Sequence, residues 1–553
     1  MIRNTLAAMT ACMLAAIGCG CGSNSGSVTP PDDNTRISLS QSASTDTSVT
    51  VDVALENADA AYCTIAAAGS ATPSLAEMRK GTSLTASGSV VFDDLAPGTS
   101  YKVFGVAGRN GVYTDIKNLT VSTSGQAADN YPAVVEAWQT SADRRSQMKS
   151  IEAGRASEAS AAATDLNIDP ARRYQTMEGF GPAITGSAAY NLLKMSAADR
   201  DRILRAAFDP AEGLGYNYVR ISIGCSDFSL DEYTCCDKEG LEFFEIHGYD
   251  RRDLFPVLEE ILAINPDVKI IAAPWTCPLW MKAPVGGTGK YDKWTGGRVD
   301  PDHYADYAEY FVMWIQEMEL NGFKIEAVTP QNEPLHDGNS ASTCMSWEQQ
   351  REFVKRHLGP AFRKAGITTK IWAYDHNFDV TDYVTNIFAD KEAAQYFDGS
   401  AWHAYGGSYT ALAKVHAAAP DKNIYFTEQS IGTWCPDFGD NLMWHMREVC
   451  LGTINNYCRA VVLWNFMLDE NRGPNRPGGC QTCYGFVDCD GTYSYSSLTY
   501  RSHWYAIGHM SKVVKRGAYR IGSSAAGVTL SAFENPDGSY SAVVLNESDK
   551  ARE

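Results

Sequence analysis

The spacing of apolar residues divides the 553-residue chain into segments of different kinds. Beyond residue 164, short apolar runs alternate with longer amphipathic segments. The short runs predict strands at 177–184, 218–223, 269–275, 327–330, 370–374, 399–403, 423–428 and 460–465. The longer segments predict helices between most of them, including 197–208, 254–264, 301–321, 347–365 and 440–456. Eight strands with intervening helices favour an α/β fold of the (β/α)8 TIM-barrel type over residues 176–510.

A doubly wound sheet is the alternative for such an alternation of strands and helices. When that fold binds a dinucleotide, a Gly-x-Gly-x-x-Gly motif follows one of its strands, and no predicted strand of this chain has one. The barrel is therefore the better prediction.

Residues 35–124 have the pattern of a small β-sandwich. The run Ser48–Leu55 alternates apolar with polar residues, as in a strand that buries one face. The stretch Leu95–Tyr101 resembles the turn and strand of fibronectin type III domains, and Tyr101 is expected to fill the corner there. This segment has no cluster of titratable residues, so we expect a fibronectin type III-like β-sandwich that acts as a spacer.

A second β-rich region flanks the predicted barrel. Near the C-terminus, apolar runs at 525–533 and 540–545 are separated by an Asn-Pro-Asp-Gly turn. These runs predict a side β-sandwich domain that consists of residues 164–175 and 511–553. Because the pattern stops at Glu553 within an apparent fold, we expect further strands beyond it.

The segment between the small sandwich and the barrel, residues 125–163, is rich in Ala, Ser and charged residues. Helical propensity is high over 138–163, but the segment has little apolar stripe. We therefore expect a solvated linker that contains a helix.

The N-terminus has the features of a targeting segment. Arg3 precedes an apolar run over 6–17, which is too short to cross a bilayer as a stable helix. The run ends at Ala16-Ile-Gly-Cys19, which resembles the lipobox of bacterial lipoproteins, in which the cysteine is lipidated. We expect a lipoprotein signal peptide at 1–19 and a flexible tether at 20–34, with a plain secretory peptide as the alternative.

Lipidation at Cys19 implies an exported protein that is anchored at the bacterial cell envelope, in the periplasm or at the cell surface, with that membrane as a partner.

The composition, 44% hydrophobic and 20% charged, is that of a globular protein. The formal net charge of −19 would repel a polyphosphate, which argues against a nucleic-acid partner. We expect a monomer.

Cysteine usage agrees with export, because most of the fifteen cysteines lie from Cys63 onward, where oxidation is possible. The pairs Cys235-Cys236 and Cys480-x-x-Cys483 lack the second pair or the histidines that a zinc site would need. A local disulfide or free buried thiols are expected, and the connectivity stays open.

Polar and aromatic residues stand at the C-terminal ends of most predicted strands, where barrel enzymes place their chemistry. These residues are Arg220, Ser222, Asp227, Trp275, Asn332, Glu333, Asp375, His376, His403, Tyr405, Glu428, Trp464 and Asn465. One such residue is ordinary, whereas residues at most of the strand ends indicate a shared active site.

Two of these residues are glutamates at opposed positions. Glu333 follows the fourth strand and Glu428 ends the seventh, and these strands face each other across an eight-stranded barrel. Glycoside hydrolysis needs two carboxyl groups, and a gap of about 5 Å gives retention whereas a gap of about 8 Å gives inversion. We expect the retaining gap. A solvated loop carboxylate is the alternative for either glutamate alone.

These residues lie in stretches that together resemble glycoside hydrolase family 30, which includes glucosylceramidases and endo-β-1,6-glucanases. The matching stretches are 175–183, 218–222, 226–229, 273–282, 329–334, 402–405 and 426–429. Barrels of this family carry a side β-domain formed by chain on both flanks, which agrees with the predicted one.

The resemblance implies that Glu333 is the acid/base and Glu428 the nucleophile. It also implies that Asn332 hydrogen-bonds the sugar 2-hydroxyl and that Arg220 holds Glu428 ionised, since a cation lowers a carboxylate pKa. Glu333 must start protonated, so the charge of Glu428 and partial burial are expected to raise its pKa. Tyr405 matches a residue that contacts the nucleophile.

Four further residues match positions that line the pocket for the nonreducing sugar. Asp227 and His403 match hydrogen-bonding residues, although His403 has the alternative of a satisfied core histidine. Trp275 and Trp464 match the walls. No metal or organic cofactor is expected, because two carboxylates suffice for the reaction and Asp375-His376 and His403 show no recognisable ligand spacing.

The loop after the eighth strand, residues 468–483, contains Gly-Pro and Gly-Cys-x-x-Cys, which resemble the β-1,6-glucanase branch. The expected function is therefore that of a retaining endo-β-1,6-glucanase that acts on β-glucan polysaccharide or oligosaccharide. An exo-acting enzyme of the glucosylceramidase or β-glucosidase type is the nearest alternative. A non-catalytic glycan-binding lipoprotein is the alternative of another class, and the presence of both glutamates argues against it.

Overall fold

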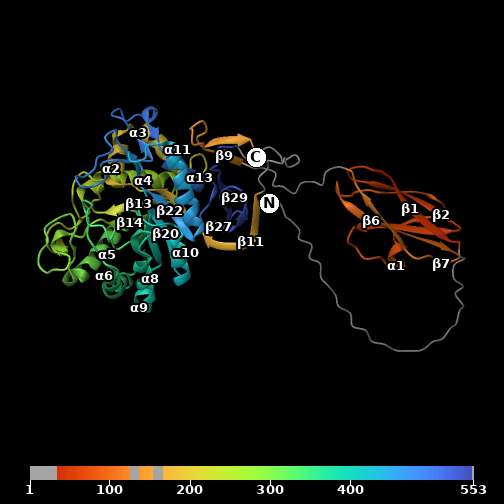
Figure 1. The fold of residues 1–553 in the computed structure, drawn as a ribbon, viewed down its shortest axis with the longest axis horizontal. Coiled ribbons are helices and arrows are strands. Elements are labelled where there is room, and N and C mark those ends of the chain that lie inside the picture. The colour runs from red at the N-terminus through yellow and green to blue at the C-terminus, as the bar shows by residue number, and fades with distance from the viewer. Residues whose placement is uncertain (1–33, 125–135, 153–165, 551–553) are drawn as a thin grey trace. The chain divides into compact units, whose positions relative to one another are not determined.

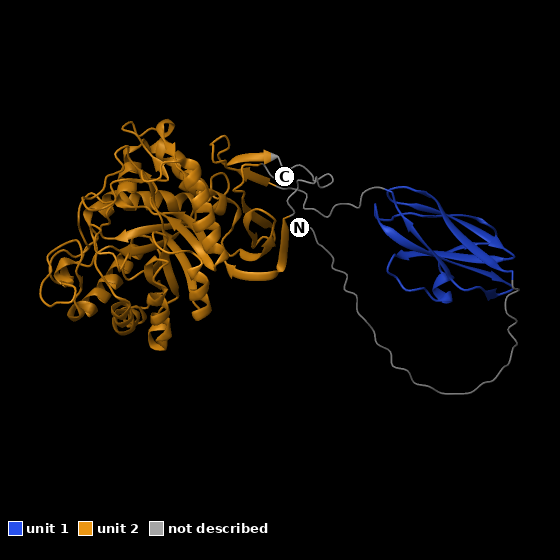
Figure 2. Ribbon diagram, viewed as in Figure 1, with its two compact units in different colours: residues 1–135 blue, residues 136–553 orange. Residues whose placement is uncertain are grey.

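The computed structural model describes residues 34–124, 136–152 and 166–550 (Figure 1). The expected signal peptide with Cys19, and the expected tether except its last residue, lie outside the described residues. The chain divides into two compact units, residues 1–135 and 136–553 (Figure 2). Among the helices of the described part, none combines the length and the apolar character needed to cross a membrane.

The first unit is a sandwich of two β-sheets around an apolar core. In β2, Val51 and Val53 are buried and Asp52 between them is exposed, so the predicted alternation places one face in the core. At the predicted corner, the backbone N–H of Ala96 donates to the Tyr101 hydroxyl at 2.8 Å. One sheet contains β1 (Arg36–Ser44), β2 (Val49–Glu56) and β5 (Gly88–Phe92), and the other contains β3 (Ala60–Ala67), β4 (Thr82–Leu84), β6 (Ser100–Arg109), β7 (Val112–Tyr113) and β8 (Lys117–Ser122), with α1 (Leu75–Met78) between β3 and β4.

The second unit is built on eight parallel strands, as predicted. They are β12 (Gly179–Pro182), β13 (Tyr218–Ile223), β14 (Lys269–Pro274), β17 (Ile325–Val328), β18 (Lys370–Asn377), β19 (Gly399–His403), β20 (Asn423–Glu428) and β22 (Cys458–Leu463). Their order is β12-β22-β20-β19-β18-β17-β14-β13, and a parallel bridge between Ala183 and Arg220 closes the ring. This arrangement is the TIM barrel.

Helices pack around these strands (Figure 1). Several ends follow local rules: Ser346 and Gln349 form a capping box at the start of α6, and Gly366, with φ 70°, ends α7. The helices are α2 (Gly186–Lys194), α3 (Ala197–Phe208), α4 (Phe255–Ile264), α5 (Tyr304–Leu320), α6 (Trp347–Phe353), α7 (Gly359–Ala365), α8 (Thr381–Ala389), α9 (Lys391–Ala394), α10 (Ala411–Ala418), α11 (Phe438–Trp444), α12 (Gly452–Asn455) and α13 (Ser502–Val513).

The interior of the barrel is filled by side chains. A buried layer from seven of the strands contains Tyr218, Ile271, Ala327, Trp372, Ala401, Tyr425, Ala460 and Val462. Within it, the rings of Trp372 and Tyr425 stack with centroids 3.6 Å apart. Because this layer is solid, chemistry is confined to the loops at the C-terminal mouth.

An antiparallel sheet lies beside the barrel and uses chain from both flanks, as predicted. Its order is β11-β27-β28-β29, with β11 (Asn167–Thr176), β27 (Tyr519–Ser524), β28 (Thr529–Glu534) and β29 (Tyr540–Leu545). Short strands in the loops are β15 (Lys282–Ala283), β16 (Arg298–Val299), β21 (Ile431–Gly432), β23 (Met467–Leu468), β24 (Cys483–Tyr484), β25 (Val487–Asp488) and β26 (Thr499–Tyr500).

The expected linker helix over 138–163 is wrong for its described part. The structure has an antiparallel hairpin of β9 (Glu136–Gln139) and β10 (Lys149–Glu152), which belongs to the second unit. Contacts with α13 hold it, since His509 lies 2.8 Å from the Thr140 hydroxyl and Lys512 lies over the Trp138 ring. Tertiary contacts therefore override the local helical propensity.

Candidate active site

Two glutamates from different strands meet at the C-terminal mouth of the barrel. Glu428 is the last residue of β20, and Glu333 lies in the turn after β17. A carboxylate oxygen of Glu333 and one of Glu428 lie within 4.8 Å of each other, and both side chains are buried. This gap agrees with the separation of about 5 Å that direct attack and retention require, and it leaves no room for the intervening water of an inverting enzyme.

A buried arginine hydrogen-bonds both the Glu428 carboxylate and Asn332, the residue before Glu333. Arg220, on β13, donates from Nη1 to Glu428 Oε2 at 2.6 Å and from Nη2 to Asn332 Oδ1 at 2.6 Å. Tyr405 donates its hydroxyl to Glu428 Oε1 at 2.9 Å. Both oxygens of Glu428 thus accept a hydrogen bond, and the carboxylate is held in one orientation. Arg220 also fixes Asn332, which leaves the amide N–H groups of Asn332 to donate elsewhere.

Asp375 is the centre of this network, although the sequence placed it only among the strand-end residues and gave it no role in the reaction. It is fully buried and accepts from Arg220 at 2.8 Å, Thr329 at 2.6 Å and Thr427 at 2.6 Å. Burial alone would raise the Asp375 pKa, but the charges of Arg220 and His403 and the hydrogen bonds together hold it well below its usual range. An irregularity in β18, where Asp375 has φ 80°, turns the side chain into the network.

His403 connects Asp375 to Glu333. It is fully buried, its Nε2 lies 3.0 Å from Asp375 Oδ1, and its Nδ1 lies 3.3 Å from Glu333 Oε1. Burial alone would lower the His403 pKa, but the charge of Glu428 and the hydrogen bonds to Asp375 and Glu333 raise it to about 9. His403 is therefore an imidazolium at neutral pH and donates from both ring nitrogens.

The proton distribution over the two glutamates differs from the expectation. Burial raises the Glu333 pKa, but the hydrogen bond and charge of His403, together with the charges of His376 and His336, lower it to below its ordinary value. Burial also raises the Glu428 pKa, and the charges of His403 and Arg220 do not cancel this effect. The expected raised pKa of Glu333 is thus wrong, because it left out His403. The Glu333–His403 pair holds one proton, which lies on His403.

Glu333, His403 and Glu428 are also the group of described residues whose ligand atoms are close enough together to hold a metal ion. Their chemistry does not fit one. Both ring nitrogens of His403 are engaged with carboxylates, so neither offers a free lone pair. Arg220 occupies an oxygen of Glu428, and a cation beside a guanidinium is disfavoured.

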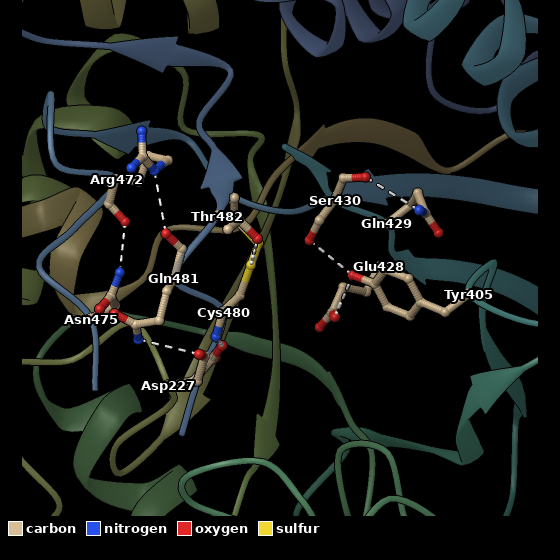
Figure 3. The surroundings of a disulfide bond; sticks show 12 residues. Asp227, Tyr405, Glu428, Gln429, Ser430, Arg472, Asn475, Cys480, Gln481 and Thr482 are labelled. Atoms are coloured by element: carbon tan, nitrogen blue, oxygen red, sulfur yellow. Dashed lines mark hydrogen bonds between the residues drawn. A yellow bond between two sulfur atoms is a disulfide. The ribbon is translucent and has the colours of Figure 1, made fainter. Parts of the chain in front are cut away.

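The three remaining predicted residues form a wall next to the glutamates. Asp227 is buried, and its Oδ2 accepts from the backbone N–H of Cys480 at 3.3 Å (Figure 3). Burial, aided by the charge of Glu428, raises the Asp227 pKa to about 7. The rings of Trp275 and Trp464 are tilted against each other with centroids 5.2 Å apart, and Arg220 lies over Trp275. Cys480 packs against the cluster that contains both tryptophans, so the nine predicted residues lie together at this mouth. The expected hydrogen bond from His403 to the sugar does not fit, because both of its ring nitrogens contact carboxylates.

Two family models match the second unit. The Glycosyl hydrolase family 30 TIM-barrel domain matches residues 177–514, and the Glycosyl hydrolase family 30 beta sandwich domain matches residues 517–553. The chain belongs to glycosyl hydrolase family 30. It is therefore a glycoside hydrolase of a retaining family, which agrees with the gap between its two glutamates.

Known family 30 proteins are similar over most of this unit. Endo-1,6-beta-D-glucanase neg1 of Aspergillus fumigatus is 30% identical, over 67% of this chain and 78% of its own length. Lysosomal acid glucosylceramidase of Mus musculus is 28% identical, over 69% and 77%. A solved structure, the endo-beta1,6-glucanase BT3312, is 48% identical with a TM-score of 0.72, over 75% of this chain and 93% of that one.

Proposed function

We propose that this protein is a retaining endo-β-1,6-glucanase that cleaves linear β-1,6-linked glucose polymers. The observation that carries the proposal is the 48% identity to an endo-β-1,6-glucanase over 93% of that chain, combined with the two buried glutamates within 4.8 Å. The curated fungal relative has the same activity in its name. The glucosylceramidase relative is less similar, at 28%.

In the proposed mechanism, the Glu428 carboxylate attacks the anomeric carbon while the glycosidic oxygen departs with a proton from Glu333. Water then attacks the glycosyl ester and gives a proton back to Glu333, which frees Glu428 and releases the sugar with its β configuration. Arg220 and Tyr405 orient the nucleophile through their hydrogen bonds to its two oxygens. In this mechanism Asn332 donates its amide N–H to the sugar 2-hydroxyl, and the support is that Arg220 holds its Oδ1 and leaves the amide N–H groups unused by that contact.

The proton for the first step is held by the Glu333–His403 pair. The raised pKa of His403 and the lowered pKa of Glu333 put it on His403 before the reaction. The 3.3 Å contact between Nδ1 and Oε1 lets it pass to Glu333 as the leaving oxygen gains negative charge. Asp375 keeps the imidazole in place through Nε2. In this role His403 and Asp375 are positioning residues of the acid.

We expect Asp375→Asn to move the alkaline limb of the kcat/KM profile to lower pH, by about one unit, and to lower the maximum about 10- to 100-fold. The acid step needs the proton of the pair, which is lost as pH rises through the His403 pKa of about 9. Removing the Asp375 charge lowers that pKa. The profile should be compared with Asp379→Asn, an exposed residue of the same segment. An unshifted alkaline limb in Asp375→Asn would refute the role of the pair.

Linkage selectivity and mode of cleavage test the proposed function. We expect kcat/KM on a β-1,6-linked glucose oligosaccharide to exceed that on β-1,3- or β-1,4-linked oligosaccharides of the same length by about tenfold or more, since lost hydrogen bonds to buried groups carry this cost. Early products from a linear β-1,6-glucan should be oligosaccharides of several lengths. Release of glucose alone, or a preference for a glucosylated lipid, would favour the exo glucosylceramidase type instead.

We further propose that the chain is exported as a monomer and anchored at the bacterial cell envelope through a lipid on Cys19. The support is the apolar run and lipobox-like ending in the sequence. The two-sheet sandwich with its Tyr101 corner supports a fibronectin type III-like spacer between anchor and enzyme. Palmitate labelling of the protein in a bacterial host should be lost in Cys19→Ala, and labelling that persists would contradict the anchor.

A further inference from the structure

A loop that follows β23 returns across the barrel mouth and lies against Asp227. The backbone N–H of Arg476 donates to the Asp227 carbonyl at 2.7 Å, and that of Cys480 donates to its carboxylate at 3.3 Å. Between these contacts, Gly479 is so close that an added Cβ would lie 2.4 Å from the Asp227 Cβ. The loop therefore sets the position of the Asp227 side chain.

The end of the same loop is joined to the chain that follows the nucleophile. Cys483 begins β24, which pairs with β21, shortly after Glu428. The backbone N–H of Thr433 donates to the Thr482 carbonyl at 2.9 Å. The loop thus contacts Asp227 near Cys480 and contacts the chain that follows the nucleophile near Cys483. Figure 3 shows Asp227 and Glu428 in the surroundings of this part of the loop.

A disulfide between Cys480 and Cys483 joins these two contacts (Figure 3). Cys483 is buried in an apolar cluster that includes both pocket tryptophans, Trp275 and Trp464, and Cys480 packs against the same cluster. The ten other cysteines of the described residues are free thiols. The bond therefore lies where the loop, Asp227 and the tryptophan wall meet.

We propose that the Cys480–Cys483 disulfide is a positioning element that holds this loop against Asp227 and thereby sets the affinity of the pocket for a glucose-configured ring. The sugar assigned to the pocket rests on the proposed function. Reduction should separate affinity from chemistry, because the two glutamates are held by Arg220 and the barrel strands rather than by the loop.

The first part of the loop is held by other contacts, whereas the later part depends on the disulfide. The first part of the loop is anchored independently, since Asn191 donates to the Gly473 carbonyl at 2.9 Å and Arg476 pairs with Glu232. The later residues Pro477, Gly478, Gln481 and Thr482 are mostly exposed. Without the covalent bond, this later part gains conformational freedom, and the Cys480 N–H is no longer held at Asp227.

The test uses the exported, oxidised protein and a dithiol such as dithiothreitol, which reduces the disulfide to two thiols while it is oxidised to its own cyclic disulfide. Calorimetry measures the Kd of a glucose-configured iminosugar before and after reduction, and a thiol assay confirms two additional thiols. We expect the Kd to rise about tenfold, and KM on the glucan to rise more than kcat falls. Reoxidation should restore both values.

The variant Cys480→Ser with Cys483→Ser should show the weakened binding permanently and no further response to dithiothreitol. Gly479→Ala tests the same contact without redox chemistry, because its methyl group collides with Asp227, and it should also raise the Kd about tenfold. Gly491→Ala, whose methyl group would meet only Glu470 at an ordinary 3.4 Å, is the matched control.

Unchanged iminosugar binding after complete reduction would overturn the proposal. The same holds if kcat falls while KM stays unchanged in the serine variant and Gly479→Ala behaves like Gly491→Ala, since this would indicate a general loss of folded protein rather than weaker sugar binding. A protein that binds the iminosugar in a reduction-sensitive way but cleaves no β-1,6-glucan would retain this inference and lose the proposed function.

Discussion

Glu428→Gln is expected to lower kcat on any β-glucoside by about 10⁴-fold or more, with sugar binding retained. The amide cannot form the glycosyl ester, so the first step has no nucleophile. Binding should persist because glutamine keeps the shape of the side chain and one oxygen that can accept from Arg220, whose Nη1 now lies 2.6 Å from the carboxylate.

The measurement is steady-state kinetics on an aryl β-glucoside, paired with the calorimetric Kd of an iminosugar. The control is Glu470→Gln. Glu470 is an exposed glutamate in the loop that follows β23, and its substitution should leave kcat unchanged. Residual activity above a few per cent in Glu428→Gln, after contamination is excluded, would rule out this residue as the nucleophile.

Glu333→Gln is expected to have the second-largest effect, and this effect depends on the leaving group. Proton donation contributes about 10²- to 10⁴-fold for a poor leaving group such as a sugar hydroxyl, whereas a nitrophenolate departs without help. Loss of kcat/KM should therefore be large on a β-1,6-linked oligosaccharide and small on a dinitrophenyl β-glucoside, for which the glycosyl ester should accumulate.

A series of aryl β-glucosides with leaving groups of graded pKa measures how the loss of kcat/KM depends on the leaving group. The slope of log kcat/KM against leaving-group pKa should be steeper in Glu333→Gln than in the unmodified protein. Equal losses across the series would contradict the assignment of Glu333 as the acid.

The sequence predicted the barrel well because each strand is a short apolar run between longer amphipathic segments. The strands at 218–223, 399–403 and 423–428 and the helix at 197–208 have the predicted bounds. The local pattern suffices here, because strands that are buried on both faces appear in the sequence as short, continuous apolar runs. The hairpin at 136–152 was missed since its contacts with α13 come from residues far away in sequence.

The positions of the two glutamates at strand ends were predicted from the sequence. The charged groups that shift their pKa values were not predicted. The predicted strand ends at residue 374, whereas the observed β18 continues to Asn377 with an irregularity at Asp375. The φ of 80° at Asp375 is a feature of three-dimensional packing that residue type does not reveal. Without Asp375, the hydrogen bonds of His403 and its raised pKa could not be anticipated. Pairing of Cys480 with Cys483, left open by spacing, likewise needed the structure.

The central claim is that Glu333 and Glu428 cleave β-1,6-linked glucan with retention. Proton NMR of the anomeric signals during the first minutes of hydrolysis of a linear β-1,6-glucan tests it most directly, because mutarotation is slower than rapid enzymatic release. We expect β-anomer reducing ends to appear first and the α-anomer to follow by mutarotation. Initial release of the α-anomer would show inversion and contradict the mechanism, and absence of any new reducing end from this glucan would contradict the proposed substrate.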